Sequence, residues 1–164
     1  MIQMNVGGLG FDPRNLSPVV LLRDAEELNF LPIWIGVFEA ASIAMVLRGV
    51  QPPRPMTHDL FKLSIEKLGG KVSRIIINDV NEGTFFSTIE IEAPHVKNKI
   101  AIDARPSDAI AMAMRTEAPI FVSENVMLKA KLVNSEKDEE ETKKFKDFVD
   151  NITPEDFTKY FKKD

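Results

Sequence analysis

The chain has 164 residues, of which 44% are hydrophobic, so it can bury the core of one domain of ordinary size with a short appendage. It contains no cysteine, which excludes disulfides, thiol nucleophiles and cysteine-ligated zinc and favours a reducing compartment. The formal net charge is −4, but residues 1–134 carry 14 basic and 15 acidic groups. This near-neutral body argues against a protein that coats nucleic acid through a broad basic field.

The sequence also lacks the features of membrane proteins. No uninterrupted apolar run approaches the roughly 18–20 residues that a membrane span needs, and the first residues lack a basic segment followed by an apolar one. We therefore expect a cytoplasmic protein without membrane contact.

The first third of the chain predicts three strands followed by a helix. The strands cover residues 1–12, 17–23 and 30–35, and a mostly apolar helix follows over Val37–Leu47 until Gly49 ends it. Because its surface is so apolar, we expect this helix to be buried. Core packing is also the interpretation of one tryptophan and three methionines: Trp34, Met45, Met112 and Met114.

A proline-rich connector and a second helix follow. The segment QPPRPM (51–56) has three prolines, which forbid helix and predict an extended link. Thr57 is the expected cap of an amphipathic helix that Gly69 and Gly70 end.

The second half predicts an antiparallel meander and then another helix. Residues 71–79 and 84–93 flank a turn at Asn81–Gly83, and residues 99–103 form the third strand. Pro106 suits the first turn of a helix that runs to Arg115, and residues 118–122 read as a further strand. Composition divides the chain into a domain over 1–133 and a charged tail over 134–164, for which we expect one or two helices.

Two stretches of the sequence resemble each other. Residues 33–48 (IWIGVFEAASIAMVLR) and 100–115 (IAIDARPSDAIAMAMR) align without a gap and match at six of sixteen positions. The alternative is that alanine-rich helices resemble one another by chance. The repeat predicts an α+β (mixed α/β) fold of largely antiparallel sheets, with two related strand–helix units packed by helices.

Positions at which the two copies differ in charge indicate where function lies. Glu39 is a carboxylate in a helix that is otherwise nearly all apolar, which costs energy unless it is at the rim, paired or liganded, although it could simply complement the helix dipole. Asp103 and Asp108 could hold a divalent cation while Arg105 binds a phosphate oxygen at the start of the second repeat helix. The alternative is a capped helix start with an Arg–Asp pair.

A third cluster lies on the connector and the helix that follows it. Arg54 could clamp a phosphate, and His58 could act as general acid or base near neutral pH, with Asp59 beside it. The same residues also suit an ordinary helix entry. His95, in a Pro-His turn, is expected to be only exposed.

Three blocks carry a family resemblance: LPIWIGVFEAASIAMVL (31–47), PRPMTHDL (53–60) and DARPSDAIAMAMRTEAPIFV (103–122). Together and in this order, they resemble the bifunctional nuclease domain family of bacteria and plants. The resemblance covers roughly residues 1–130 and implies a mixed α/β domain, a homodimer with a groove, and degradation of DNA and RNA. It transfers candidate status to seven residues of the matching blocks: Glu39, Arg54, His58, Asp59, Asp103, Arg105 and Asp108.

These observations support two hypotheses. The first is a nuclease that hydrolyses phosphodiester bonds of DNA or RNA with Mg²⁺ or Mn²⁺ held by Glu39, Asp103 and Asp108, phosphate contacts from Arg54 and Arg105, and no organic cofactor. The second is a non-enzymatic dimeric module that binds a small anionic ligand or a protein partner.

Overall fold

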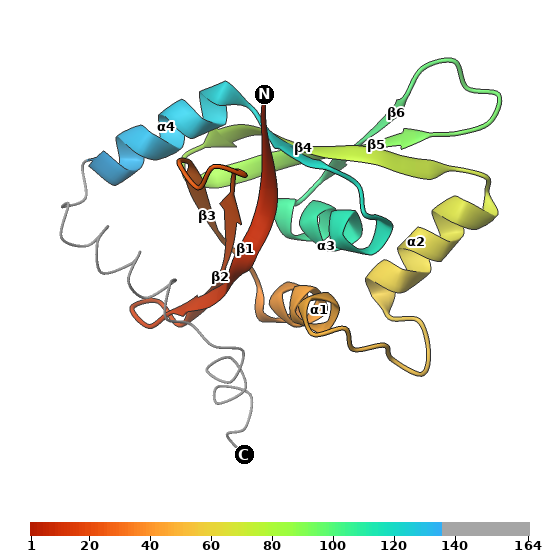
Figure 1. Cartoon of the computed structure of the whole chain (residues 1–164), viewed down its shortest axis with the longest axis horizontal. Helices are drawn as coiled ribbons and strands as arrows, with labels where there is room; N and C mark the ends of the chain where they lie inside the picture. The colour runs from red at the N-terminus through yellow and green to blue at the C-terminus, as the bar shows by residue number, and fades with distance from the viewer. Residues whose placement is uncertain (136–164) are drawn as a thin grey trace.

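The computed structural model describes residues 1–135, which form one seven-stranded sheet and four helices (Figure 1). The strands are β1 (Ile2–Asp12), β2 (Ser17–Arg23), β3 (Phe30–Trp34), β4 (Lys71–Asn81), β5 (Thr84–Glu92), β6 (Ile100–Ala104) and β7 (Ile120–Val122). The helices are α1 (Val37–Leu47), α2 (Thr57–Lys67), α3 (Pro106–Thr116) and α4 (Glu124–Ser135). The predicted α+β fold is therefore confirmed.

The sheet contains two meanders joined through β7. Its strand order is β3-β2-β1-β7-β4-β5-β6, and each pairing is antiparallel except that of β4 with β7. Each meander ends at an outer strand, β3 or β6, and each outer strand leads into a helix, α1 or α3. The two predicted strand–helix units are thus present, and they begin from opposite edges of one sheet.

Local sequence explains most element boundaries. The β4–β5 hairpin turns at Glu82 and Gly83, whose φ angles of 48° and 78° are the two positive values that a type I′ turn requires. Helix α2 ends before Gly69, which has a φ of 80° and takes the left-handed conformation that favours glycine. Pro106 is the first residue of α3, as predicted, because its missing N–H costs nothing there.

Helix α3 is the centre of the helical layer. It contacts α1, α2, β4 and β5, and most of its residues are buried, including Ile110 and Met112. Helix α1 packs on α3 and β2, whereas α4 packs on β4, apart from the other three helices (Figure 1). This arrangement brings the beginnings of α1, α2 and α3 to one side of the sheet.

Three expectations from the sequence were wrong, two about packing and one about a helix cap. Helix α1 buries only one face, and Phe38 at its start is 88% exposed. Trp34 is 42% exposed because its indole points out of the core, where Nε1 donates a hydrogen bond to Asp12 Oδ2 at 3.1 Å. The N-cap of α2 is Met56 rather than Thr57, since the Asp59 carboxylate accepts the Met56 N–H at 2.9 Å.

Two further results concern the end of the described chain. Helix α4 was not predicted, and it crosses the boundary drawn from composition at residue 134. The helices expected in the tail lie outside the described residues. None of the helices formed by residues 1–135 has the length and apolar character needed to cross a bilayer.

Candidate active site

His58, the second residue of α2, lies where α1, α2 and α3 meet. Its Nδ1 is 2.8 Å from the Oγ of Ser42 on α1, and its Nε2 is 2.9 Å from the Oδ1 of Asp108 on α3. Its side chain is only 13% exposed. An ionised carboxylate only accepts hydrogen bonds, so Asp108 assigns the imidazole proton to Nε2 and leaves Nδ1 to accept from the Ser42 hydroxyl.

Arg105 extends this contact to a second carboxylate. It is the N-cap residue of α3, its Nε donates to Asp108 Oδ2 at 2.8 Å, and its Nη2 lies 2.8 Å from Glu39 Oε1. The hydrogen bond and charge of Asp108, with a further contribution from Glu39, raise the pKa of Arg105. We call the five connected side chains the His58 network: Ser42, His58, Asp108, Arg105 and Glu39.

Gly36 explains how Glu39 reaches this position. A Cβ atom added at Gly36 would lie 2.2 Å from Glu39 Oε2, so the missing side chain leaves room for the carboxylate to fold back over the start of α1. The Glu39 side chain is 16% exposed and its charge is paired with that of Arg105. The cost of placing a carboxylate in an apolar helix is thereby reduced.

Asp59 forms a separate ion pair close to the network. Its Oδ1 accepts a hydrogen bond from Arg115 Nε at 2.7 Å, and Arg115, whose side chain is 6% exposed, also donates to the carbonyl oxygen of Ser42. Burial raises the pKa of Asp59, but the hydrogen bonds from Arg115 and Met56 and the charge of Arg115 outweigh that effect and lower it. This pair links α2 to α1 and α3.

The two remaining candidates stand outside the network. Arg54 is exposed on the connector between α1 and α2, and it makes no hydrogen bond or ion pair with any described residue. Asp103 is exposed on β6, opposite Thr88 of β5, and likewise has no polar partner within residues 1–135. The structure therefore joins Glu39, His58, Arg105 and Asp108, and it gives Arg54 and Asp103 no hydrogen bond or ion pair with them.

The arrangement of the carboxylates can be compared with what the predicted metal site would need. Within the described part of the chain, no group of three or more His, Asp or Glu side chains is arranged to hold an ion. Glu39 and Asp108 both face the Arg105 guanidinium, which already places a positive charge between them. As these side chains stand, they fit an arginine rather than a divalent cation.

Sequence reasoning missed Ser42 and Arg115. Ser42 follows Glu39 by three residues, so the two polar side chains of α1 share one helix face, and that spacing was a usable signal. Arg115 is one of the six matched repeat positions, and its partner fifty-six residues away could not be read from the sequence.

Comparison with known proteins now gives the family. Residues 20–135 match the model of the bifunctional nuclease domain. An uncharacterised protein of Mycobacterium tuberculosis is 41% identical over 166 residues, with 96% of this chain and 98% of that protein covered.

Plant relatives match over a shorter region. Bifunctional nuclease 1 of Oryza sativa subsp. japonica is 27% identical over 109 residues, and bifunctional nuclease 1 of Arabidopsis thaliana is 26% identical over 108. Each match covers about two thirds of this chain and 33% of the plant protein. With the family model covering most of its described length, this chain belongs to the bifunctional nuclease domain family.

Proposed function

We propose that this protein hydrolyses phosphodiester bonds in DNA or RNA, and that the His58 network is its active site. The observation that carries the proposal is the unbroken hydrogen-bonded series from Ser42 through His58 and Asp108 to Arg105. It combines a base, a carboxylate that orients the base, and a cation, which are the groups that phosphoryl transfer needs. The family match and the plant nucleases support the same reaction class.

His58 is the proposed general base. Asp108 accepts the Nε2 proton and thereby fixes the ring, so the basic lone pair of Nδ1 faces the Ser42 hydroxyl. A water molecule that attacks phosphorus would pass its proton to the Ser42 hydroxyl, which would give its own proton to Nδ1. The leaving oxygen would then take a proton from the imidazolium.

Arg105 is the proposed phosphate contact. Its side chain is 67% exposed, and its Nη1 donates to no described residue, which leaves two N–H groups for a substrate. The guanidinium would offset the charge that develops on the phosphate oxygens in the transition state. Arg54, which is exposed and unpaired among the described residues, is a second candidate for contact with a neighbouring phosphate.

The expected Mg²⁺ or Mn²⁺ stays a prediction. When bound, such an ion would polarise a phosphate oxygen and lower the pKa of a bound water. Glu39, Asp103 and Asp108 were the predicted ligands, and Arg105 would have to leave the two carboxylates that it now bridges. Parallel cleavage assays with Mg²⁺, with Mn²⁺ and with EDTA test this expectation.

The two histidines of the chain provide the test of the reaction. We expect His58→Asn to lower cleavage of DNA and RNA by about 10²- to 10⁴-fold, which is the usual contribution of a general acid or base. His95→Asn is the matched control, because His95 is exposed and has a φ of 68°, which asparagine tolerates. Equal rates for the wild type and both variants would contradict the assignment.

A homodimer is proposed from the exposed apolar side chains of α1, α2, their connector and the C-cap of α2. These residues are Val37, Phe38, Leu47, Val50, Met56, Leu60, Leu63 and Leu68. Contiguous apolar patches on a surface are typical of protein contacts, and we take these side chains to form one. Sedimentation of the wild type and of Phe38→Ser tests the dimer, which the substitution should weaken.

The same observation favours the second candidate function, a dimeric module without catalytic activity. That alternative would be supported if the pure protein is dimeric, binds a partner and cleaves no nucleic acid.

A further inference from the structure

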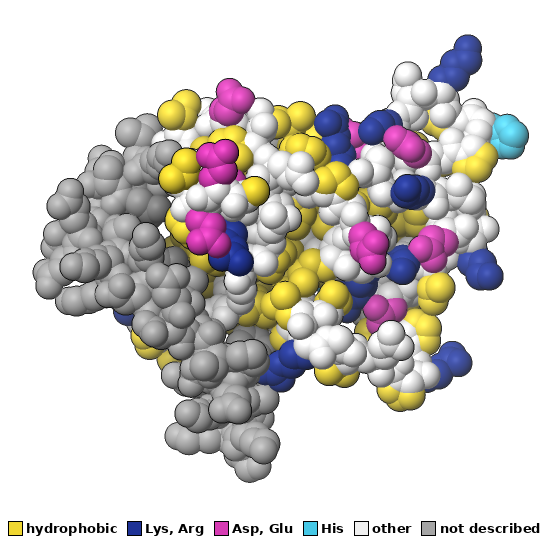
Figure 2. Space-filling view, in the orientation of Figure 1, with side chains coloured by type: hydrophobic (Ala, Val, Ile, Leu, Met, Phe, Trp, Pro, Cys, Tyr) yellow, Lys and Arg dark blue, Asp and Glu magenta, His cyan; other side chains and the backbone are white. Residues whose placement is uncertain are grey.

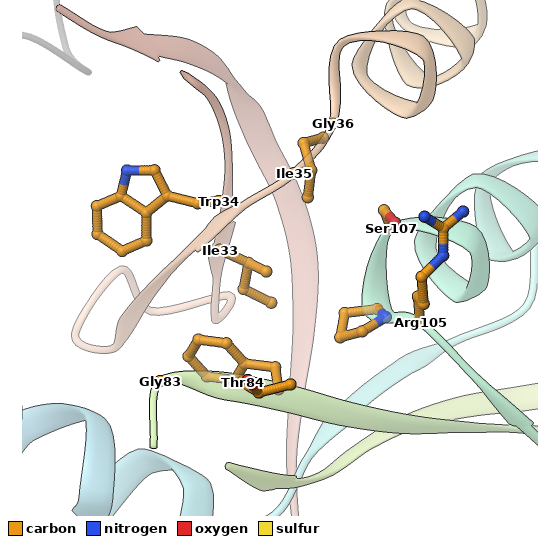
Figure 3. Close-up of a pocket in the computed structure, with 10 residues that line it drawn as sticks. Ile33, Trp34, Ile35, Gly36, Gly83, Thr84, Arg105 and Ser107 are labelled. Carbon is orange, nitrogen blue, oxygen red and sulfur yellow. The ribbon is translucent and has the colours of Figure 1, made fainter. Parts of the chain in front are cut away.

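A cavity of about 360 Å³ opens beside the His58 network and shares Arg105 with it (Figure 3). It lies between the end of β3, the turn of the β4–β5 hairpin and the start of α3. Most of its walls are apolar, with Ile33, Ile35, Phe85 and Pro106 among the lining residues. An apolar cavity of this size with a few polar groups is typical of a site for a small organic ligand.

Ser107 places an unsatisfied polar group in this cavity. The residue lines the cavity from the first turn of α3 and is only 6% exposed. Its hydroxyl makes no hydrogen bond within residues 1–135, and its backbone N–H has no acceptor there either. No side-chain oxygen or nitrogen in that range is both sealed from solvent and unpaired, so the hydroxyl is reached through the cavity. A buried hydroxyl without a partner costs free energy, which a ligand that accepts its hydrogen bond would recover.

The donors around Ser107 favour an oxyanion. Figure 3 shows Ser107 between Ile35 and Arg105, whose Nη1 donates to no described residue. Gly36 and Arg105, the N-cap residues of α1 and α3, both line the cavity, so two helix N-termini of positive partial charge meet there. Neither helix has a side-chain cap. One group with several acceptor oxygens would satisfy these donors together.

The charges on this side of the cavity determine which oxyanion fits. Nη2 of Arg105 already lies 2.8 Å from a carboxylate oxygen of Glu39 and of Asp108. The two helix ends add roughly half an elementary charge each, so the sum with the guanidinium and the two carboxylates is about zero. A group with one negative charge is therefore favoured over one with two. A phosphodiester carries one charge, whereas a phosphate monoester carries about −1.5 to −2 at pH 7.

We propose that this cavity binds a phosphodiester group, whose oxygens accept hydrogen bonds from the Ser107 hydroxyl, the Ser107 N–H and Arg105 Nη1. The organic group attached to the phosphate would lie against the apolar walls. This inference rests on the proposed function and deepens it, because the diester is the one assigned there to Arg105. Ser107 is then a second phosphate-binding residue, and the substrate class is an internal phosphodiester rather than a terminal phosphate.

Surface charge gives a separate reason for a local phosphate site. Acidic and basic side chains are interspersed on the face shown in Figure 2, and residues 1–134 carry 14 basic and 15 acidic groups. Attraction of a polyanion to a broad basic field is therefore small. Hydrogen bonds from a few fixed donors must supply most of the affinity for the phosphate.

Calorimetric titration with three probes that share one nucleoside tests the site. They are the methyl ester of thymidine 5′-monophosphate, which is a diester, thymidine 5′-monophosphate itself, and thymidine. We expect the methyl ester to bind about tenfold more tightly than thymidine, and more tightly than the monophosphate. Chromatography of the recovered methyl ester checks that it is intact. Equal binding of thymidine, or tighter binding of the monophosphate, overturns the proposal.

Two buried serines provide the matched variants. Ser87 is fully buried and does not line the cavity, and its hydroxyl donates to the carbonyl oxygen of Ala104 at 2.6 Å. We expect Ser107→Ala to weaken binding of the methyl ester about tenfold while the thermal midpoint of the free protein is kept or raised, because no hydrogen bond is lost. Ser87→Ala should lower the midpoint by about 2–4 °C and leave the affinity unchanged. Unchanged affinity in Ser107→Ala, or a midpoint lowered as much as in Ser87→Ala, would contradict the site.

Cleavage assays on the same proteins separate this proposal from the nuclease activity. Equal cleavage of DNA or RNA by the wild type and by Ser107→Ala, with unchanged affinity for the methyl ester, would overturn the Ser107 site and leave the nuclease in place. Binding of the methyl ester that depends on Ser107, without cleavage of any nucleic acid, would support the site while contradicting the nuclease.

Discussion

The two strand–helix units differ most at the beginnings of their helices. Ile43 of α1 and Ile110 of α3 are matched in the repeat and are both fully buried. Five residues before these isoleucines, Phe38 occupies the position of Arg105, and two residues before them, Ala41 occupies that of Asp108. Buried shared residues such as these pack the two helices, while residues that differ between the copies supply every group of the His58 network except His58 itself, which lies on α2.

The second difference concerns the ends of the same helices. Arg48 and Arg115 are matched in sequence, yet Arg48 is exposed whereas the Arg115 side chain is 6% exposed and pairs with Asp59. The cause is α2, which packs on α3 and brings Asp59 to the second unit only. An identical residue in a repeat therefore takes a different role when a third element packs on one copy.

Asp108→Ala has the largest expected effect on nuclease activity. It places in the second unit the alanine that Ala41 provides in the first. It removes the hydrogen-bond partner of His58 Nε2 and one of the two carboxylates at Arg105. We expect nuclease activity to fall by about 10²- to 10⁴-fold, with little change in the thermal midpoint. Initial cleavage rates on single-stranded substrates measure the loss.

The control for that variant is Asp79→Ala, which removes an exposed ion pair with Lys129. Its cleavage rate should equal that of the wild type. A collapsed thermal midpoint in Asp108→Ala would show that Asp108 is needed for folding rather than for catalysis.

The next largest effect, on stability, is expected from the arginines that are matched in the repeat, Arg115 and Arg48. Arg115→Met leaves Asp59 without its ion-pair partner between α2 and α3, and we expect a loss of about 2–3 kcal/mol in the free energy of unfolding. Arg48→Met, at the exposed counterpart, should change stability by less than about 0.5 kcal/mol. Urea unfolding of both variants measures the contrast. Similar losses would mean that the repeat, and not the Asp59 contact, determines the role of the arginine.

Acid should reduce the difference in stability between the wild type and Arg115→Met. The pKa of Asp59 is lowered in the folded state, since the favourable bonds and charge of Arg115 outweigh burial. The unfolded chain therefore binds more protons, so the Asp59 contribution is present above about pH 4 and is lost as pH falls through the folded pKa. Thermal midpoints from pH 7 to pH 2 should converge for the wild type and Arg115→Met. A constant difference would contradict the assigned pair.

Local pattern was enough to predict the elements but not the site. The glycines, Pro106 and the Asn81–Gly83 turn gave helix ends and a hairpin that the structure confirms, because those signals depend on neighbouring residues alone. The contacts of His58 join residues sixteen and fifty positions apart, and they depend on how α2 packs against α1 and α3.

The burial of single side chains also could not be predicted from the sequence. Phe38 and Trp34 are apolar in character, but both lie on faces that no described element covers fully, which only the assembled sheet and helices decide. Composition could not distinguish a residue of the core from one that lines a cavity.

The smallest expected effect comes from Gly36, the counterpart of Asp103. In Gly36→Ala the new methyl group would lie 2.2 Å from Glu39 Oε2, and the flexible glutamate side chain can turn away at little cost. We expect stability to change by less than about 1 kcal/mol, while Arg105 loses Glu39 and keeps Asp108. Cleavage should then change to the same small extent in Gly36→Ala, in Glu39→Ala and in the double variant, because all three remove the contact of Glu39 with Arg105. If the double variant is more impaired than either single variant, Glu39 and Gly36 act independently, and Glu39 does more than hold the guanidinium of Arg105.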